Sequence, residues 1–275
     1  MHDLPHQNIT IAATAPTLRK PLTPRHDDAA QPHLIVAWAR DSEEIREAQH
    51  LRYRVFADEM GATLKGATGL DIDEYDEYCD HLLVRDKASL KVVGTYRVLP
   101  PHQAGRLGKL YAEGEFDLSR FKHLRPKMLE LGRSCVHPDY RSGSVIMTLW
   151  SGLAGYMKKH GYETMLGCAS VPMADGGHYA ASLYTQLQQR AMTSPEYRAT
   201  PHIPLPIADL QSNLAVEPPA LMKGYLRLGA RICGAPAWDP DFNTADFLTL
   251  FRLSEINPRY ARHFLGQAAL DALTL

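Results

Sequence analysis

Short apolar runs alternate with segments of helical periodicity along most of this chain. Apolar runs bounded by turn residues predict strands at 34–39, 80–85, 91–99, 127–136, 164–171, 230–233 and 247–253. Apolar positions three or four apart predict helices from Asp41 to near Gly61, from Val145 to Gly161, from Asp175 to about Gln189, and over 218–228. This order of elements predicts an α/β fold, with helices on both faces of one sheet.

The first 33 residues follow neither period, and their Pro, Ala, Thr and His content predicts a flexible N-terminal tail. The composition of the 275 residues, 45% hydrophobic and 22% charged, is typical of a soluble globular protein. A formal net charge of -1 argues against a general nucleic-acid binder. No apolar run approaches the ~18 residues that span a bilayer, and no secretory signal is evident, so we expect a cytoplasmic protein.

Neither the cysteines nor the histidines predict a metal site. The four cysteines form no CxxC pair, which favours reduced thiols, and the thirteen histidines form no HExxH pattern. The segment Glu130–Trp150 carries more information, because it reads as a strand, a tight loop and the start of a helix. A helix N-terminus presents unpaired backbone N–H groups and a positive dipole end, which together suit a phosphate. Glu130 lies in the strand predicted before this loop and is a candidate base.

The segment Leu129–Trp150 resembles motif A of the GNAT N-acyltransferase superfamily, which grips the pyrophosphate of coenzyme A. Arg141 is present, Gly143 comes one position early, and Ile146 stands where a small residue is expected. The resemblance implies a GNAT-like acyltransferase domain over 34–275, with a mixed central sheet. It also implies that a phosphopantetheine arm is held by Val136, Arg141, Ser142, Gly143, Ser144 and Val145. An acyl carrier protein donor, whose arm has a single phosphate, needs only part of the coenzyme A cradle.

A set of mostly charged residues is similar in order to that of the acyl-homoserine lactone synthases, which are GNAT-fold enzymes using acyl carrier protein. The set comprises Arg52, Phe56, Asp73, Asp76, Arg97, Glu130 and Arg133. Gly132 replaces the usual Ser of that family, and the Trp usual after its first helix is missing. The resemblance makes the charged members other than Glu130 candidates for binding substrate.

A third resemblance, to the bacterial ornithine N-acyltransferases, covers the chain from about Leu34 to Phe264. The block ELGRSCVHPDYR and the segments KGYLRLGA and DFNT carry it. It implies transfer of a 3-hydroxyacyl chain from acyl carrier protein to the α-amine of ornithine, the first step of ornithine lipid synthesis. No cofactor is implied beyond the carrier's phosphopantetheine. The product has one long chain, so we expect peripheral contact with the inner membrane, for which the segment 202–210 is a candidate.

The chemistry needs a proton acceptor, because an α-amine must lose a proton to attack a thioester. Glu130 is the candidate, and its structural alternative is a carboxylate paired with Arg133 or Arg97. A backbone N–H near 135–136 would stabilise the oxyanion. Tyr184 could act as a general acid, or it could simply pack beside its aliphatic neighbours on the helix.

Two interpretations of the other charged residues stay open. Arg52 or Arg97 could bind the carboxylate of ornithine, with Asp73 and Asp76 meeting its side-chain ammonium. Alternatively these aspartates pair with the arginines and order the loop. For carrier docking the sequence offers basic residues, namely Arg106, Lys109, Lys122, Arg125, Lys158 and Lys159.

Three rival functions also remain. The acceptor could be another amine, such as glycine, glutamine or a homoserine-lactone precursor. The chain could be a membrane-active lysin, although it shows neither an export signal nor an insertion helix. It could also bind acyl carrier protein without catalysis.

Overall fold

A computed structural model describes residues 33–64, 69–259 and 262. The predicted tail therefore lies outside the described residues, apart from His33. The helices are α1 (Ser42–Tyr53), α2 (Pro101–Leu107), α3 (Ser144–His160), α4 (His178–Arg190) and α5 (Ala220–Leu228). The strands are β1 (Leu34–Trp38), β2 (Asp80–Asp86), β3 (Val92–Leu99), β4 (Phe116–Asp117), β5 (Met128–Val136), β6 (Thr164–Pro172), β7 (Thr200–Pro201), β8 (Arg231–Ile232), β9 (Ala237–Asp239) and β10 (Thr244–Arg252).

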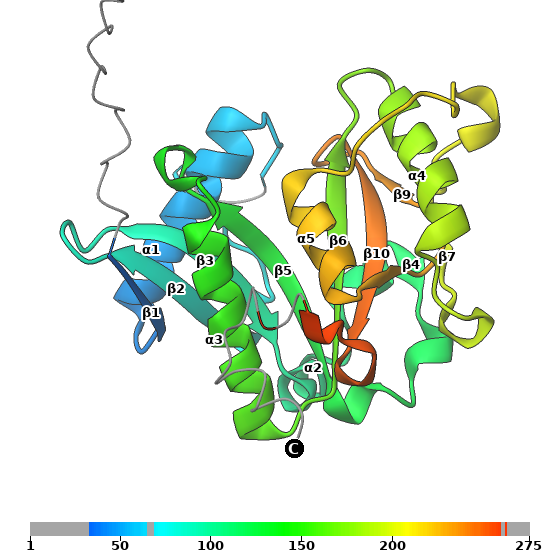
Figure 1. Ribbon diagram of the computed structural model, residues 1–275. Helices are drawn as coiled ribbons and strands as arrows, with labels where there is room; N and C mark the ends of the chain where they lie inside the picture. Colours follow the sequence, from blue (N-terminus) through cyan, green and yellow to red (C-terminus); the bar gives the residue numbers. More distant parts are fainter. Residues whose placement is uncertain (1–32, 65–68, 260–261, 263–275) are drawn as a thin grey trace, which may run out of the picture. The chain divides into compact units, whose positions relative to one another are not determined.

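The main sheet runs β1-β2-β3-β5-β6-β10-β8, with β9 paired to β10, while β4 and β7 pair separately (Figure 1). The pairing of β5 with β6 is parallel, and all other pairings are antiparallel. The α/β class and the mixed sheet with helices on both faces are confirmed. The short strands β4, β7 and β9 have no apolar run long enough to be predicted.

The sheet divides where β5 and β6 part (Figure 1). These strands pair only over Met128–Glu130 and Thr164–Leu166, after which β5 continues with β3, and β6 continues with β10. Gly167 lies at the point of separation, where an added Cβ would stand 2.5 Å from the carbonyl oxygen of Leu131. Only glycine allows the strands to approach this closely before they diverge.

Each face of the sheet has its own cover. On one face, which we call the helical face, α3, α4 and α5 pack against alternate strand residues such as Tyr96, Leu129 and Phe247. On the other, which we call the loop face, α1 packs beside Leu83, and the segment 110–124 packs against Leu166 and its neighbours. Because side chains alternate along a strand, adjacent residues contribute to opposite faces.

Helix starts follow the predicted capping residues, with differences in detail. The side chain of Asp41 accepts hydrogen bonds from the N–H groups of Glu43 and Glu44, as an N-cap should. The Glu44 carboxylate accepts a hydrogen bond from the N–H of Arg40, the residue before this N-cap. After Tyr53 the first helix continues as a π-helical segment, Arg54–Glu59. Asp175 accepts from the N–H of Tyr179, at the start of α4.

Candidate active site

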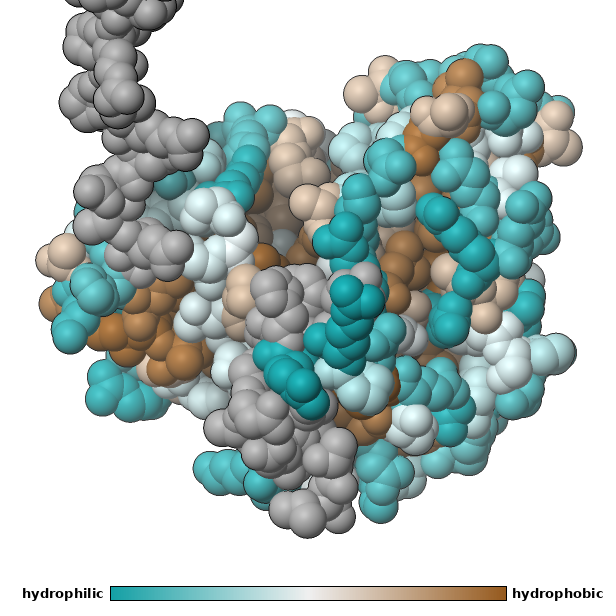
Figure 2. Space-filling view, viewed as in Figure 1, coloured by the Kyte–Doolittle hydropathy of each residue, from teal (hydrophilic) through white to brown (hydrophobic). Residues whose placement is uncertain are grey.

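A cavity of about 700 Å³ opens where β5 and β6 diverge. On the loop face it is lined by polar groups, which include Arg97, Tyr111, Glu130, Cys168, Ser170 and Asp246. On the helical face its lining is largely apolar, and includes Tyr96, Leu153, Met157, Met165, Leu228 and Phe251. Figure 2 shows apolar residues in the recess between the two halves of the sheet. The cavity therefore joins a polar compartment and an apolar one through the gap in the sheet.

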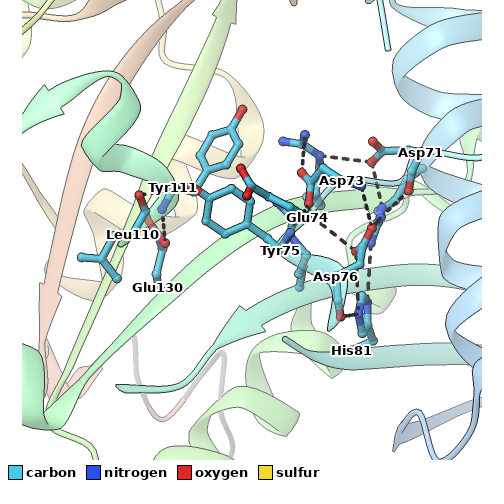
Figure 3. A network of polar contacts seen from close by, with 12 residues as sticks. Asp71, Asp73, Glu74, Tyr75, Asp76, His81, Leu110, Tyr111 and Glu130 are labelled. Carbon is cyan, nitrogen blue, oxygen red and sulfur yellow. Dashed lines mark hydrogen bonds and ion pairs between the residues drawn. The ribbon is translucent and has the colours of Figure 1, made fainter. Parts of the chain in front are cut away.

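Glu130 is the last residue of β5 to pair with β6, and it lies at the junction of the two compartments. Its carboxylate accepts hydrogen bonds from the backbone N–H groups of Tyr111 (2.7 Å) and Ala112 (2.8 Å), at the start of a short 3-10 helix (Figure 3). Neither Arg97 nor Arg133 forms an ion pair with Glu130 within the described residues. The predicted structural alternative, pairing with one of these arginines, is therefore wrong.

Burial raises the pKa of Glu130 to about 7, against the opposing effect of the two amide hydrogen bonds. The residue is only 5% exposed. A carboxyl group with this pKa is divided between its two protonation states near neutral pH, which suits a group that accepts a proton and later returns it.

The charged residues of the predicted set other than Glu130 form one largely buried network together with Asp71 (Figure 3). We call its carboxylates Asp71, Asp73 and Asp76 the paired cluster. Arg52 binds Asp71 through Nε (2.8 Å) and Asp76 through Nη2 (2.9 Å). The remaining ion pairs are Arg97–Asp73 (2.5 Å), Arg97–Asp76 (3.5 Å), Arg133–Asp71 (3.1 Å) and Arg133–Asp73 (3.2 Å). Of the two interpretations left open by the sequence, the pairing that orders the loop is the one observed.

The negative charges of the paired cluster are matched by the positive charges of Arg52, Arg97 and Arg133. Burial acts to raise the pKa of Asp73, but the positive charges of Arg97 and Arg133 outweigh it, and the pKa lies below its ordinary value. Burial lowers the pKa of His81, and its Nε2 lies 3.1 Å from the carbonyl oxygen of Asp76. Three carboxylates thus meet three guanidinium groups, and Arg97 and Arg133 also line the cavity.

Arg133 has an unusual backbone conformation, with φ of 51°, in the left-handed region that non-glycine residues rarely adopt. The register between β3 and β5 shifts at the same place. The guanidinium of Arg133 lies 5.1 Å from the ring centre of Tyr111 and 4.9 Å from that of Phe242, both of which line the cavity. Such irregularities re-aim side chains at functional sites, and this one directs an arginine toward the polar compartment.

The loop before α3 was predicted to hold phosphopantetheine, and part of it lines the cavity, namely Val136, Arg141 and Gly143. Gly143 has φ of 101° and precedes the first turn of α3. The Arg141 guanidinium forms a two-bonded ion pair with Glu59 (2.5 and 2.7 Å). The hydroxyls of Ser142 and Ser144 lie 3.3 Å apart. The side chain of Val145 is buried against Gly94, so only its backbone could face an arm.

Tyr184 does not line the cavity. It lies on α4, partly buried against the apolar cluster that includes Leu183 and Leu187. Burial raises the pKa of its hydroxyl. The structure thus places the predicted general acid away from Glu130, in the packed position that was its alternative.

Several residues around the cavity were missed from the sequence. Asp71 belongs to the paired cluster, and Tyr111 supplies an N–H to Glu130. A second group of carboxyls, from Glu115, Asp239 and Asp246, lies on the β6–β10 side of the gap. Burial and the neighbouring carboxyls Asp246 and Asp239 raise the pKa of Glu115 to about 9. Asp246, the acidic residue of the mostly apolar strand β10, is the signal in the sequence that could have indicated this second group.

None of the helices in the described part of the chain combines the length and apolar character that crossing a bilayer requires.

Comparisons with known proteins agree with this architecture. Residues 51–151 match the acetyltransferase (GNAT) domain family. The chain is 37% identical to an L-ornithine N(alpha)-acyltransferase of Brucella abortus (strain 2308), over 86% of this chain and 90% of that protein. It is 36% identical to an L-ornithine N(alpha)-acyltransferase of Agrobacterium fabrum (strain C58 / ATCC 33970), over 84% of each.

Solved structures show the same fold. The AHL synthase LasI superimposes with a TM-score of 0.51 at 15% identity, over 86% of this chain and 96% of that one. The CoA-dependent acyl-homoserine lactone synthase BjaI, solved with MTA, gives 0.50 at 15% identity, over 88% of both. The expected GNAT fold is therefore confirmed.

Proposed function

We propose that this chain, which belongs to the L-ornithine N(alpha)-acyltransferase family, transfers a 3-hydroxyacyl group from acyl carrier protein to the α-amine of ornithine. The membership rests on relatives that are 32–37% identical over most of the chain. The observation that carries the mechanism is the position of Glu130. This buried carboxyl lies where a polar and an apolar compartment meet, and its pKa of about 7 suits proton transfer.

The reaction forms one amide bond and breaks one thioester bond. The uncharged α-amine attacks the thioester carbonyl, and the carbonyl oxygen becomes an oxyanion. The proton released by the amine passes to Glu130, directly or through a water. The tetrahedral intermediate then expels the thiolate, which takes up that proton and leaves as a thiol. The two amides that hold Glu130 fix its carboxylate in place before the substrates arrive.

The gap between β5 and β6 could accept the phosphopantetheine arm of the acyl donor. Beyond Glu130 the described residues of β5 pair only with β3, so the opposite edge of 131–136 is available to an extended phosphopantetheine arm. Backbone N–H groups on this edge could also stabilise the oxyanion. The apolar compartment between α3 and α5 suits a long acyl chain. Because Arg141 already pairs with Glu59, the loop offers a reduced cradle, which favours the single phosphate of a carrier arm over coenzyme A.

The acceptor fits the polar compartment, where the guanidinium groups of Arg97 and Arg133 line the cavity. A guanidinium is the preferred partner of an α-carboxylate. This arrangement would turn the α-amine toward Glu130. Since the paired cluster already neutralises these arginines, the carboxylate of ornithine would bind as a further partner, not as the sole one.

The product would carry one long acyl chain, and a single chain binds a bilayer only reversibly. We therefore place the enzyme in the cytoplasm, in peripheral contact with the inner membrane.

The experiment is an assay of the purified chain with 3-hydroxyacyl-acyl carrier protein and, separately, 3-hydroxyacyl-coenzyme A. Each donor is offered ornithine, glycine, glutamine or homoserine, and products are identified by mass spectrometry. We expect Nα-acylornithine from the carrier protein. A different acceptor would overturn the acceptor assignment, and activity with coenzyme A alone would overturn the donor. No product with any amine would favour a binding protein.

The variant Glu130→Gln keeps the size of the side chain but cannot accept the proton. We expect its kcat to fall by roughly 10²–10⁴-fold, the usual contribution of a general base. The matched control is Glu163→Gln, which removes an exposed carboxyl just before β6 that does not line the cavity and should leave kcat unchanged. Full activity of Glu130→Gln would remove the base from the mechanism.

A further inference from the structure

A second group of carboxyls lies at the polar compartment, and we call Glu115, Asp239 and Asp246 the unpaired cluster. Asp239 and Asp246 line the cavity, and Glu115 lies behind them beside Asp246 and Cys168. Glu115 follows the short 3-10 helix, Asp239 ends β9, and Asp246 lies in β10. Oxygen atoms of Glu115 and Asp246 lie within 4.8 Å of each other and of the Cys168 sulfur. Asp239 and Asp246 line the same cavity as Glu130, and Asp246 is 4% exposed.

The unpaired cluster has no positive partner. Within the described residues no Lys, Arg or His lies within 4.0 Å of these three carboxyls, whereas each member of the paired cluster meets at least one guanidinium. None of their contacts brings a positive charge: Thr244 Oγ1 donates to Asp246 (2.8 Å), Cys168 Sγ donates to Glu115 (3.4 Å), and two backbone N–H groups donate to Asp239. Asp246 also hydrogen-bonds to Ser170, and the Glu115 and Asp246 carboxyls hydrogen-bond to each other. Buried carboxyls without a cation are costly, so a cationic ligand would stabilise them strongly.

The distance to Glu130 matches a diamino acid. Glu130 pairs with Leu166, and Cys168, which touches Glu115, lies two residues further along β6 on the same face of the sheet. Two residues of a strand span about 7 Å. The two nitrogens of an extended ornithine are separated by five bonds, or roughly 6 Å at ordinary bond lengths. An α-amine at Glu130 therefore places the side-chain ammonium within reach of the unpaired cluster.

We propose that Asp246 and Glu115, with Asp239 beside them, bind the side-chain ammonium of the amino-acid acceptor. The proposal rests on the proposed function and adds how the acceptor is selected. Glu115 and Asp246 hydrogen-bond to each other and their pKa values are raised, so they hold a proton between them. When the ammonium binds, this proton passes to solvent water and the ammonium becomes the counter-ion of the carboxylates. The same contact keeps the side-chain amine protonated, so that it cannot attack the thioester, and directs acylation to the α-amine.

The test compares ornithine with norvaline, which has the same carbon skeleton and α-amine but no side-chain amine. For the wild-type chain with its acyl donor we expect kcat/KM to favour ornithine by on the order of 10⁴–10⁵-fold, as in sites built to hydrogen-bond a polar substrate group. In Asp246→Asn and in Glu115→Gln the ornithine-to-norvaline ratio should fall by at least about tenfold, mainly through KM for ornithine.

Controls separate recognition from folding. Asp246→Glu keeps the charge and should retain most of the preference, while Asp209→Asn, an exposed carboxyl away from the cavity, should not change it. If Asp246→Asn does not fold, as judged by a thermal melt, Asp239→Asn answers the same question. A ratio that stays constant while both substrates lose activity equally would overturn the proposal. So would wild-type activity that is lost with a chelator and restored by a divalent cation. Failure to acylate any amino acid would instead contradict the proposed function.

Discussion

Two groups of buried and half-buried carboxyls lie near one cavity, and they differ in their partners. On the β3–β5 side, Asp71, Asp73 and Asp76 are neutralised by three arginines. On the β6–β10 side, Glu115, Asp239 and Asp246 have no cationic partner within the described residues. An opposite charge beside a buried carboxylate offsets the cost of removing that carboxylate from water, so a paired carboxylate can act as part of the fold. A carboxyl without a cationic partner lowers the stability of the protein, and a bound cationic ligand can offset that loss. Such a carboxyl is therefore the better candidate for binding a ligand.

The paired cluster should be the more sensitive of the two to substitution. Arg52→Met removes the fully buried guanidinium that holds Asp71 and Asp76, and it leaves both carboxylates short of a cation. We expect a loss of about 3–5 kcal/mol in the free energy of unfolding, measured by chemical denaturation. The control is Arg40→Met, whose ion pair with Glu44 lies at the surface, and which should leave the midpoint unchanged. A small effect of Arg52→Met would mean that the network does not hold the loop 71–78 in place.

The same isosteric change should have opposite consequences in the two clusters. Asp76→Asn removes a carboxylate that accepts from Arg52 and Arg97, so we expect a loss of about 2 kcal/mol or more. Asp246→Asn removes a buried carboxyl that has no cationic partner among the described residues, so we expect a loss of less than about 1 kcal/mol, or a gain. Denaturant unfolding of both variants at neutral pH makes the comparison. Equal losses would show that the clusters play equivalent structural roles.

The junction between the two halves should depend on Gly167. In Gly167→Ala the new methyl group would meet the Leu131 carbonyl, so β5 and β6 must shift apart. We expect a loss of about 1–3 kcal/mol and a raised KM for the acyl donor. Gly155→Ala, on α3 with open space at its Cα, should instead be neutral or mildly stabilising. Unchanged stability and KM in Gly167→Ala would mean that the close approach of the strands is not required.

The unpaired cluster should also shape the pH dependence of stability. The pKa of Glu115 is raised in the folded protein to about 9, mainly by burial and also by Asp246 and Asp239. Its contribution to stability is therefore fully present below the unfolded pKa of about 4.3, and is lost as the pH rises toward 9. Thermal melts of Glu115→Gln should decline less than the wild type between pH 5 and pH 9. An identical decline would show that Glu115 is not the responsible group.

Most of the fold could be predicted from the sequence. The apolar periodicity of 145–161 and the alternation in 80–99 reflect burial directly, so their elements appear within a few residues of the predicted bounds. Part of the site could also be predicted, because family resemblance picks out residues such as Arg52 and Glu130 in order along the chain.

The remaining site residues depend on tertiary contacts. Asp246 and Glu115 are more than a hundred residues apart in sequence and meet only because β10 pairs with β6 and the loop after α2 crosses the same face. The amides that hold Glu130 carry no side-chain signal at all. Tyr184 lies on a helix stripe where catalytic and packed aromatic residues look alike in sequence.

The most direct test of the account is the pH dependence of kcat/KM for ornithine in the wild type and in Glu130→Gln. Two deprotonations precede attack, one of Glu130 with a pKa of about 7 and one of the α-amine with a pKa of about 8. The wild-type logarithmic profile should therefore rise with a slope near 2 at low pH and bend at about pH 7. Glu130→Gln should rise with a slope near 1, at much lower rates. Superimposable profiles would contradict the role of Glu130 as the proton acceptor.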